Sequence, residues 1–224
     1  MKLMIATPAY DGKVHVQYAV ALSETILLLA QNNIEVKINI PTSGSLLVAE
    51  RNRILMAFMD SDCTHLLCID SDLGWPAQAV LALIKHDEEF IAGVYPSRGE
   101  NSFTFRAKLN EDSSVVKNSK NLLGMQYIPA GFMMIKRSVI EKMQQKFPEL
   151  YYEPKAESLK FAKGWYFFAT EIWEGEFWGE DYTFCRKARE CGVDIWCDPL
   201  IEFDHAGTRG MLVNALTDKK PEEK

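Results

Sequence analysis

Two aspartates separated by one residue follow an apolar run in the first third of the chain. Asp70 and Asp72 come directly after residues 66–69, a run without polar alternation that is typical of a strand covered on both faces. Residues two apart in an extended chain point to the same side, so we expect both carboxylates to face one point. Hard oxygen ligands at the carboxyl end of a central parallel strand suit a divalent cation that would neutralise a diphosphate. The alternative is that either aspartate only caps the next helix or turns the chain.

A second acidic pair opens a predicted helix at residues 180–191. Asp181 shares a face of that helix with Phe184 and Cys185, which predicts that its carboxylate points inward. Acidic residues in a first turn are stabilised by the helix dipole, and this explains Glu180 better than Asp181. Withdrawal from water raises the pKa of a carboxyl group toward the range useful for a general base, whereas the helix N-terminus lowers it. The sequence leaves that balance open.

A histidine follows the last predicted strand, at residues 194–197. His205 lies in the segment Asp-His-Ala-Gly and is a candidate to complete the coordination begun by Asp70 and Asp72. A nitrogen ligand beside carboxylates favours Mn²⁺ over Mg²⁺. A single histidine near a strand end is more often structural, so His205 is a candidate only because the aspartates exist.

The elements that must position these groups alternate in the manner of an α/β sheet. Helical segments separate short apolar runs, at about the length that a crossover between parallel strands needs. Strands are predicted at residues 2–7, 34–40, 64–70, 90–95 and 133–135, and helices at residues 14–32, 45–60, from Pro76 onward and at 138–146. Residues 109–122 are polar and predict a surface loop, and Gly192 is the expected residue just past the helix at 180–191. We expect one domain over residues 1–213 and a charged, disordered tail over 214–224.

Composition narrows the class of protein. The chain has 224 residues, 47% of them hydrophobic, and 25 Lys and Arg against 31 Asp and Glu, for a net charge of −6. Without a dense basic cluster we do not expect a nucleic-acid partner. The longest apolar stretch is too short for a membrane span and no signal peptide is evident, so we expect a soluble, cytoplasmic protein. The five cysteines show no C-x-x-C spacing and predict reduced core thiols.

Taken in order, residues 3–209 resemble the GT-A glycosyltransferases, particularly the inverting, family 2-like group. The run GEDYTFCRKARECGVDIWCDP at residues 179–199 is the most specific part of the resemblance, and GVYPSR at residues 93–98 is similar to viral and fungal mannosyltransferase-like members. The resemblance implies a Rossmann-like GT-A fold, with a mostly parallel central sheet flanked by helices in one domain.

The resemblance also implies roles for individual residues. Asp181 would be the catalytic base, and the metal, Mn²⁺ or Mg²⁺, would be held by Asp70, Asp72 and His205. Tyr10 would stack on the nucleotide base and Arg209 would neutralise the diphosphate. The implied nucleotide-sugar contacts are Thr7, Pro8, Ala9, Tyr10, Arg51, Asp70, Ser71, Gly131 and Arg209.

The implied activity is the transfer of a sugar, in the hexosyltransferase class, from a UDP- or GDP-sugar to an acceptor hydroxyl by one in-line displacement. The longer histidine motif of the retaining branch is absent from HAGTRG at residues 205–210, which favours inversion. The acceptor stays open among carbohydrate, lipid-linked and protein classes. Two alternatives stay open as well: a sugar-1-phosphate nucleotidylyltransferase, whose glycine-rich basic first loop is missing from TPAYDG, and an inactive carbohydrate- or nucleotide-binding accessory protein on the same scaffold.

Overall fold

The apolar run before Asp70 forms β3 (His65–Ile69), a strand inside the central sheet of the computed structural model. Leu66 and Cys68 face one hydrophobic cluster, and Leu67 and Ile69 face another. Alternate side chains of a strand point to opposite faces, so a run without polar residues reports two covered faces. The prediction of a buried central strand is confirmed. The structure describes residues 1–42, 44–99, 104–110, 118–153 and 163–217.

The central sheet has eight strands in the order β2-β1-β3-β8-β5-β13-β7-β6. The other seven are β1 (Lys2–Ala6), β2 (Glu35–Asn39), β5 (Phe90–Ala92), β6 (Lys108–Leu109), β7 (Leu123–Tyr127), β8 (Phe132–Lys136) and β13 (Ile195–Cys197). β8 pairs antiparallel with both β3 and β5, and β7 pairs antiparallel with β13 and β6. All strands except β8 and β7 therefore run in one direction, which fits the expected mostly parallel sheet.

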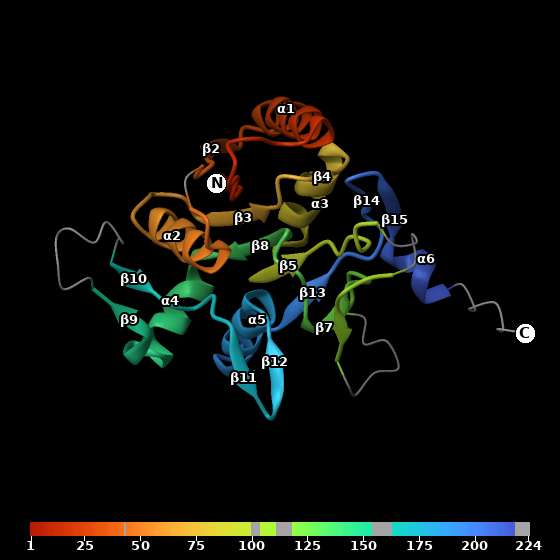
Figure 1. Cartoon of the computed structure of the whole chain (residues 1–224). Helices are drawn as coiled ribbons and strands as arrows, with labels where there is room; N and C mark the ends of the chain where they lie inside the picture. The colour runs from red at the N-terminus through yellow and green to blue at the C-terminus, as the bar shows by residue number, and fades with distance from the viewer. Residues whose placement is uncertain (43, 100–103, 111–117, 154–162, 218–224) are drawn as a thin grey trace, which may run out of the picture.

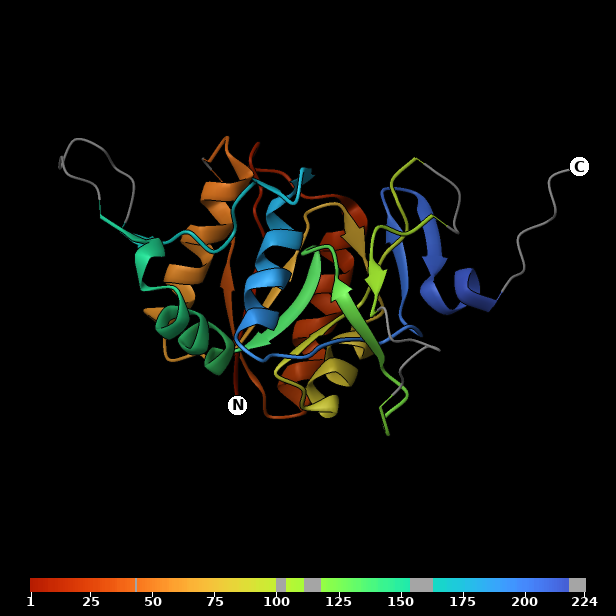
Figure 2. The same cartoon turned by 90° about the horizontal axis from the view of Figure 1, so that it is seen from below.

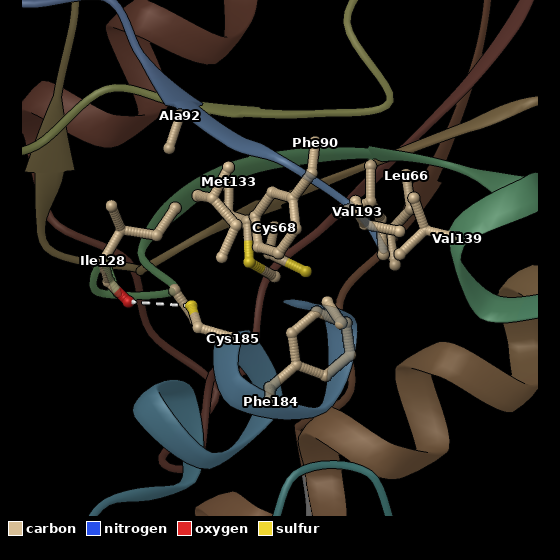
Figure 3. Packing of buried hydrophobic residues seen from close by; sticks show 14 of the residues in the cluster. Leu66, Cys68, Phe90, Ala92, Ile128, Met133, Val139, Phe184, Cys185 and Val193 are labelled. Carbon is tan, nitrogen blue, oxygen red and sulfur yellow. Dashed lines mark hydrogen bonds between the residues drawn. The ribbon is translucent and has the colours of Figure 1, made fainter. Parts of the chain in front are cut away.

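Helices cover both faces of this sheet (Figures 1 and 2). α1 (Val16–Gln31) and α3 (Ala77–His86) pack on one face, and α2 (Leu47–Met59), α4 (Arg137–Lys146) and α5 (Glu180–Glu190) pack on the other. Figure 3 shows how α5 enters the second layer, with Phe184 and Cys185 against residues of β3, β5 and β8. The described residues thus form one three-layer α/β domain, in agreement with the predicted fold class.

Short strands and helices complete the chain. β4 (Leu73–Gly74), β14 (Glu202–His205) and β15 (Thr208–Met211) form a three-stranded sheet. β9 (Tyr151–Tyr152) pairs with β10 (Gly164–Trp165), and β11 (Glu171–Trp173) pairs with β12 (Glu176–Trp178). The 3₁₀ helix η1 (Pro148–Leu150) follows α4, and α6 (Leu212–Thr217) ends the described chain. Among the described residues, no helix combines the length and the hydropathy needed to cross a bilayer.

Several helix boundaries and loop segments differ from the predicted ones or extend beyond the described residues. Pro76 precedes α3 as its N-cap, with extended backbone at ψ 136°, and is not the first helical residue. Gly192 does follow α5, and its φ of +75° is the left-handed backbone conformation that commonly ends an α-helix. α6 runs to Thr217, inside the segment predicted as a tail from residue 214, and residues 218–224 lie outside the described residues. Within the predicted loop at 109–122, residues 111–117 also lie outside them.

Candidate active site at the end of β3

The chain turns sharply where β3 ends. The Leu73 N–H donates to the Asp70 carbonyl at 3.3 Å, and the His15 N–H donates to the Ser71 carbonyl at 2.9 Å. Residues 70–73 are therefore a turn, and the expectation of an extended backbone between Asp70 and Asp72 was wrong. That both carboxylates face one point stays a prediction. Asp70 and Asp72 have separate sets of partners.

Asp70 is held by two donors from different elements. Its Oδ1 accepts from Arg51 Nη2 at 2.9 Å, and its Oδ2 accepts from the Tyr95 hydroxyl at 3.1 Å. Arg51 is only 4% exposed, and its Nε lies 3.4 Å from Glu180 Oε1. This guanidinium therefore joins α2 to the end of β3 and the start of α5. Its proposed contact with the nucleotide stays a prediction.

Gly131 leaves the space in which Tyr95 and Asp70 meet. A Cβ at position 131 would lie 2.2 Å from the Tyr95 hydroxyl oxygen and 2.3 Å from Asp70 Oδ2, closer than such atoms approach. The Asp70 N–H also donates to the Gly131 carbonyl at 2.9 Å. The structure thus places Gly131 beside Asp70, and a steric requirement explains why the residue is glycine. The contact of Gly131 with the nucleotide-sugar, which the resemblance implied, stays a prediction.

Tyr95 is a candidate site residue that the sequence did not single out. Burial and the charge of Asp70 raise the pKa of its phenol well above the usual value, so the hydroxyl stays a proton donor. Its ring also packs edge-on against the His205 ring, with centroids 5.0 Å apart. Tyr95 lies in the segment GVYPSR, which supported the resemblance. Only the fold shows that Tyr95 contacts Asp70 and also packs against His205, the partner of Asp72.

Asp72 pairs with His205 and Arg98. Asp72 Oδ2 lies 3.3 Å from His205 Nε2 and 3.4 Å from Arg98 Nη1. The hydrogen bond from His205 lowers the pKa of Asp72. Burial lowers the pKa of His205, but the hydrogen bonds to Asp72 and to the Pro96 carbonyl outweigh burial, and the net shift is upward. A chain-distant imidazole does therefore reach the D-x-D segment.

A hairpin brings His205 there. β14 pairs with β4, placing His205 opposite Leu73, and the Ala206 N–H donates to the Asp72 carbonyl at 3.1 Å. Ala206 and Gly207 both have positive φ, which closes the turn to β15. The hairpin therefore closes over the turn at the end of β3.

Among the described residues, no three His, Cys, Asp or Glu side chains are arranged to bind a metal ion. Asp72 and His205 nevertheless fit two positions around one cation. His205 Nδ1 lies 2.8 Å from the Pro96 carbonyl, so it carries the proton and directs Nε2 toward Asp72. Histidine ligands of metals are commonly fixed in this way. The ligand role of Asp70, whose oxygens accept from Arg51 and Tyr95, stays a prediction.

Asp181 lines a cavity of about 460 Å³ together with Tyr95, His205, Arg98 and Tyr182. Burial, followed by the negative charge of Glu180, raises the pKa of Asp181 to about 6. Its Oδ1 accepts from the Tyr182 N–H at 2.9 Å, and this bond and Arg51 only partly offset the rise. Burial therefore outweighs the helix N-terminus, which settles the balance that the sequence left open.

A second cavity of about 460 Å³ adjoins the turn. It is lined by residues 11 and 13–15 of the first loop, by residues 16 and 17 at the start of α1, and by Ser71, the middle residue of the D-S-D segment. Of the four implied contacts in the preceding residues, Thr7 and Ala9 are buried, Pro8 is half-buried and Tyr10 is 68% exposed. The Thr7 hydroxyl is hydrogen-bonded to the Tyr18 hydroxyl at 2.6 Å, so its side chain supports the loop from inside.

Arg209 lines neither of the two cavities at the turn. Its Nε donates to Asp204 Oδ2 at 3.0 Å, and its side chain is 76% exposed. It lines a third cavity of about 350 Å³ beside Gln17 and Trp75. In the cavity that contains Asp181, Arg98 is the arginine beside Asp72. The diphosphate role of Arg209 stays a prediction.

No protein-family model matches the chain, and no curated protein matches it. Among solved structures, it is similar to S. aureus TarS 1–349 in complex with UDP, at 14% identity and a TM-score of 0.46 over 88% of this chain and 58% of that chain. It is also similar to GalNAc-T7 with UDP, GalNAc and Mn²⁺, at 11% identity and a TM-score of 0.45 over 94% of this chain and 43% of that chain. The inositol-1-phosphate CTP transferase from T. maritima matches at 10% identity and a TM-score of 0.43 over 88% of each chain.

The chain spans about half the length of the TarS and GalNAc-T7 chains that it matches. Likeness at this level assigns neither a family nor an activity. The geometry of the site must carry a functional proposal.

Proposed function

We propose that this chain is a GT-A-type glycosyltransferase that moves a sugar from a nucleoside-diphosphate-sugar to an acceptor hydroxyl. One observation carries the proposal: the Asp70–Asp72 turn contributes to two cavities, with Ser71 lining one and Arg98 and His205, the partners of Asp72, lining the other. A donor that crosses the turn would place its nucleoside beside residues 11–17, its diphosphate at the turn and its sugar toward Asp181.

The diphosphate would meet cationic groups at the turn. Arg98 and His205 both lie within 3.4 Å of Asp72 Oδ2. Asp72 and His205 are the residues that would hold a divalent cation, Mn²⁺ or Mg²⁺, and Asp70 is a proposed third ligand. Such a cation, when bound, stabilises negative charge on a departing diphosphate.

Asp181 is the proposed general base. Because its pKa is raised to about 6, its carboxylate is largely ionised at neutral pH and still basic enough to accept a proton. The acceptor hydroxyl oxygen would form a bond to the anomeric carbon while the bond from that carbon to the diphosphate breaks. The hydroxyl proton goes to Asp181, and the electron pair of the broken bond leaves with the nucleoside diphosphate. One displacement of this kind inverts the anomeric centre.

The groups around Asp70 would keep the donor side rigid. Arg51 ties Asp70 to Glu180, next to Asp181 in the chain, and Tyr95 ties it to the cavity wall. A fixed distance between base and leaving group is what an in-line displacement requires. Arg51 and Tyr95 would therefore act as positioning residues.

Each of the two alternatives requires different groups at the site from those of a glycosyltransferase. An accessory protein that only binds sugar has no use for a carboxylate whose ionisation is disfavoured by burial, as at Asp181. A nucleotidylyltransferase would need basic groups around a triphosphate, whereas residues 3–12 contain no Arg or Lys. Both observations favour the transferase.

The test is the release of nucleoside diphosphate from a panel of UDP- and GDP-sugars, with and without Mn²⁺. Wild type should release nucleotide from one donor, and Asp72→Asn and Asp181→Asn should not. A donor that binds, as shown by calorimetry, yet is never turned over would favour the accessory protein. Pyrophosphate-dependent formation of a nucleoside triphosphate from the nucleotide-sugar would favour the nucleotidylyltransferase.

A further inference from the structure

A further cavity, of about 280 Å³, lies beside α5, and we call it the β7–α5 cavity. Its lining residues come from β7, β12 and α5, and they are Gln126, Tyr127, Trp178, Arg186, Arg189 and Glu190. Tyr182, Arg186 and Arg189 are spaced i, i+4 and i+7, so they share one side of α5. Tyr182 lines the cavity that contains Asp181, whereas the two arginines line the β7–α5 cavity. The two cavities therefore lie along the same side of this helix.

Aromatic rings in contact connect the two cavities. The Tyr127 and Tyr182 ring centroids are 4.1 Å apart with an angle of 33° between the ring planes, and each ring lines one of the two cavities. Tyr127 also packs edge-on against Trp178, with ring centroids 5.6 Å apart. Tyr127, Trp178 and Tyr182 are all half-buried, which leaves part of each side chain open to a ligand. A series of three rings thus runs from the cavity of the proposed base into the β7–α5 cavity.

The polar groups of the β7–α5 cavity suit a neutral ligand with many hydroxyl groups. The Gln126 amide donates and accepts hydrogen bonds, Arg189 donates them and Glu190 accepts them. The cavity therefore offers charges of both signs and favours neither an anion nor a cation. Sugar hydroxyls both donate and accept, and the apolar face of a pyranose ring packs well on aromatic rings. Binding sites for small molecules combine such apolar walls with a few placed polar groups.

Arg186 holds this cavity in shape. Its guanidinium forms ion pairs with Glu190 and, at 2.6 Å, with Glu171 of β11. Its Cζ also lies 3.9 Å from the centroid of the Trp173 ring. These contacts fix the β11–β12 hairpin, and with it Trp178, against α5. A rigid aromatic wall loses little conformational entropy when a ligand binds to it.

The spacing along α5 fits a ligand that occupies both cavities. The helix rises by about 1.5 Å per residue, so Tyr182 and Arg186 are separated by about 6 Å along the axis. This separation is of the same order as the length of one sugar unit in a chain. A sugar that reacts beside Asp181 would therefore direct its next unit toward Trp178.

We propose that the acceptor is an oligosaccharide of at least two units, with the reacting unit beside Asp181 and the next unit bound in the β7–α5 cavity against Trp178. This inference rests on the proposed function and deepens it by naming the class of acceptor and a second subsite for it. The added contacts would hold the acceptor hydroxyl in a fixed position relative to Asp181, as a single displacement requires.

An array of immobilised mono-, di- and trisaccharides, probed with the full chain, identifies a ligand. Calorimetry then measures the dissociation constants of the preferred disaccharide and of its two component monosaccharides. Wild type should bind the disaccharide about tenfold or more tightly than either monosaccharide. Trp178→Ala should bring this ratio close to one. Phe177→Ala is the matched control: Phe177 is the preceding residue of β12, is 73% exposed and lines neither cavity, so the ratio should be kept.

Arg189→Gln provides a second variant, because Arg189 is exposed and its loss should leave the fold intact. It should weaken the disaccharide and leave the monosaccharides unchanged. Wild type that binds no glycan of two or more units better than its monosaccharides would overturn the inference. Equal losses in Trp178→Ala and Phe177→Ala would also overturn it, and so would unchanged disaccharide binding in Arg189→Gln.

These binding ratios do not depend on turnover. A chain that prefers the disaccharide through Trp178 but releases nucleotide from no donor would overturn the proposed function and keep the second sugar subsite. A chain that releases nucleotide from one donor and has no preference for the disaccharide would overturn the inference alone. Support for both requires that the disaccharide serve as acceptor with a lower KM than either monosaccharide.

Discussion

Asp72 Oδ2 lies 3.3 Å from His205 Nε2, although the two residues are far apart in the sequence. The contact depends on the β14–β15 hairpin, whose β14 pairs with β4 directly after the Asp72 turn. A second pair of the same kind exists between His86 and Asp198, also at 3.3 Å, and neither of its residues lines either of the two cavities at the turn. Matched substitutions in the two pairs therefore distinguish a role in metal binding from a role in stability.

Asp72→Asn and His205→Gln should each weaken Mn²⁺ binding by about 10- to 100-fold, because each removes one of two adjacent ligand atoms. Isothermal titration with Mn²⁺ in the presence of the preferred nucleoside diphosphate measures the effect. His86→Gln and Asp198→Asn are the matched controls and should leave the affinity for Mn²⁺ unchanged. Equal losses in both pairs would mean that the substitutions act through folding and that Asp72 and His205 are not ligands.

Gly131→Ala should disrupt the bond between Tyr95 and Asp70, because its Cβ would overlap both oxygen atoms. We expect a loss of stability on the order of 1–3 kcal/mol, as for other overpacked buried sites, and a large fall in kcat/KM. Urea denaturation and nucleotide release measure the two effects. Tyr95→Phe removes only the hydroxyl and should reproduce the catalytic loss with a smaller change in stability. Wild-type activity in Tyr95→Phe would refute a positioning role for this contact.

The position of Asp181 was predictable from sequence, whereas the surroundings of Asp70 were not. Helical periodicity placed Asp181 on the face of Phe184 and Cys185, and both of those residues are fully buried. Local periodicity suffices there because helix geometry relates the three side chains directly. Tyr95 and Gly131 meet Asp70 through the neighbouring strands of the sheet, and no local pattern encodes which strands become neighbours.

The antiparallel strand β8 illustrates the same limit. Residues 133–135 were predicted to form a strand, and they lie within β8. The insertion of that strand between β3 and β5 is what brings Gly131 beside Asp70. Strand order is set by packing across the whole sheet, so a single sequence reveals the strand and not its place. The prediction for residues 70–73 failed for a local reason: it assumed that the extended backbone continues past the last residue of β3.

Arg51→Ala should destabilise the protein more than the removal of any surface arginine. Arg51 is buried against Asp70 and Glu180, and its loss leaves a partly buried carboxylate without its cation. Breaking such a pair costs about 3–5 kcal/mol, measured here by urea denaturation. Arg209→Ala is the control: its side chain is 76% exposed and its ion pair with Asp204 should contribute at most about 1 kcal/mol. The same variant tests the diphosphate role of Arg209, which predicts a raised KM for the donor.

Activity should depend on the ionisation of Asp181. Because burial raises its pKa to about 6, kcat/KM should rise with pH and level off above that value, since only the ionised carboxylate accepts a proton. Glu180→Gln removes the neighbouring negative charge that contributes to the rise, so the midpoint of the profile should move to lower pH. A profile whose midpoint stays the same in Glu180→Gln would mean that another group controls the rate.

The same carboxyl group should make the folded state less stable at neutral pH. Its pKa is higher in the folded protein than the ordinary value of 3.8, so the folded state binds the proton more tightly than the unfolded state does. This contribution to stability is fully present below pH 4, is lost as the pH rises from about 4 to 6, and is absent above. Asp181→Asn abolishes the ionisation and should therefore be more stable than wild type at pH 7, by on the order of 1–3 kcal/mol, while losing about 100-fold or more in kcat. Thermal unfolding at pH 4 and pH 7 tests the sign, because the advantage of the variant should shrink at the lower pH. A variant that is less stable than wild type at both pH values would show that the carboxylate supports the fold and would weaken its assignment as the base.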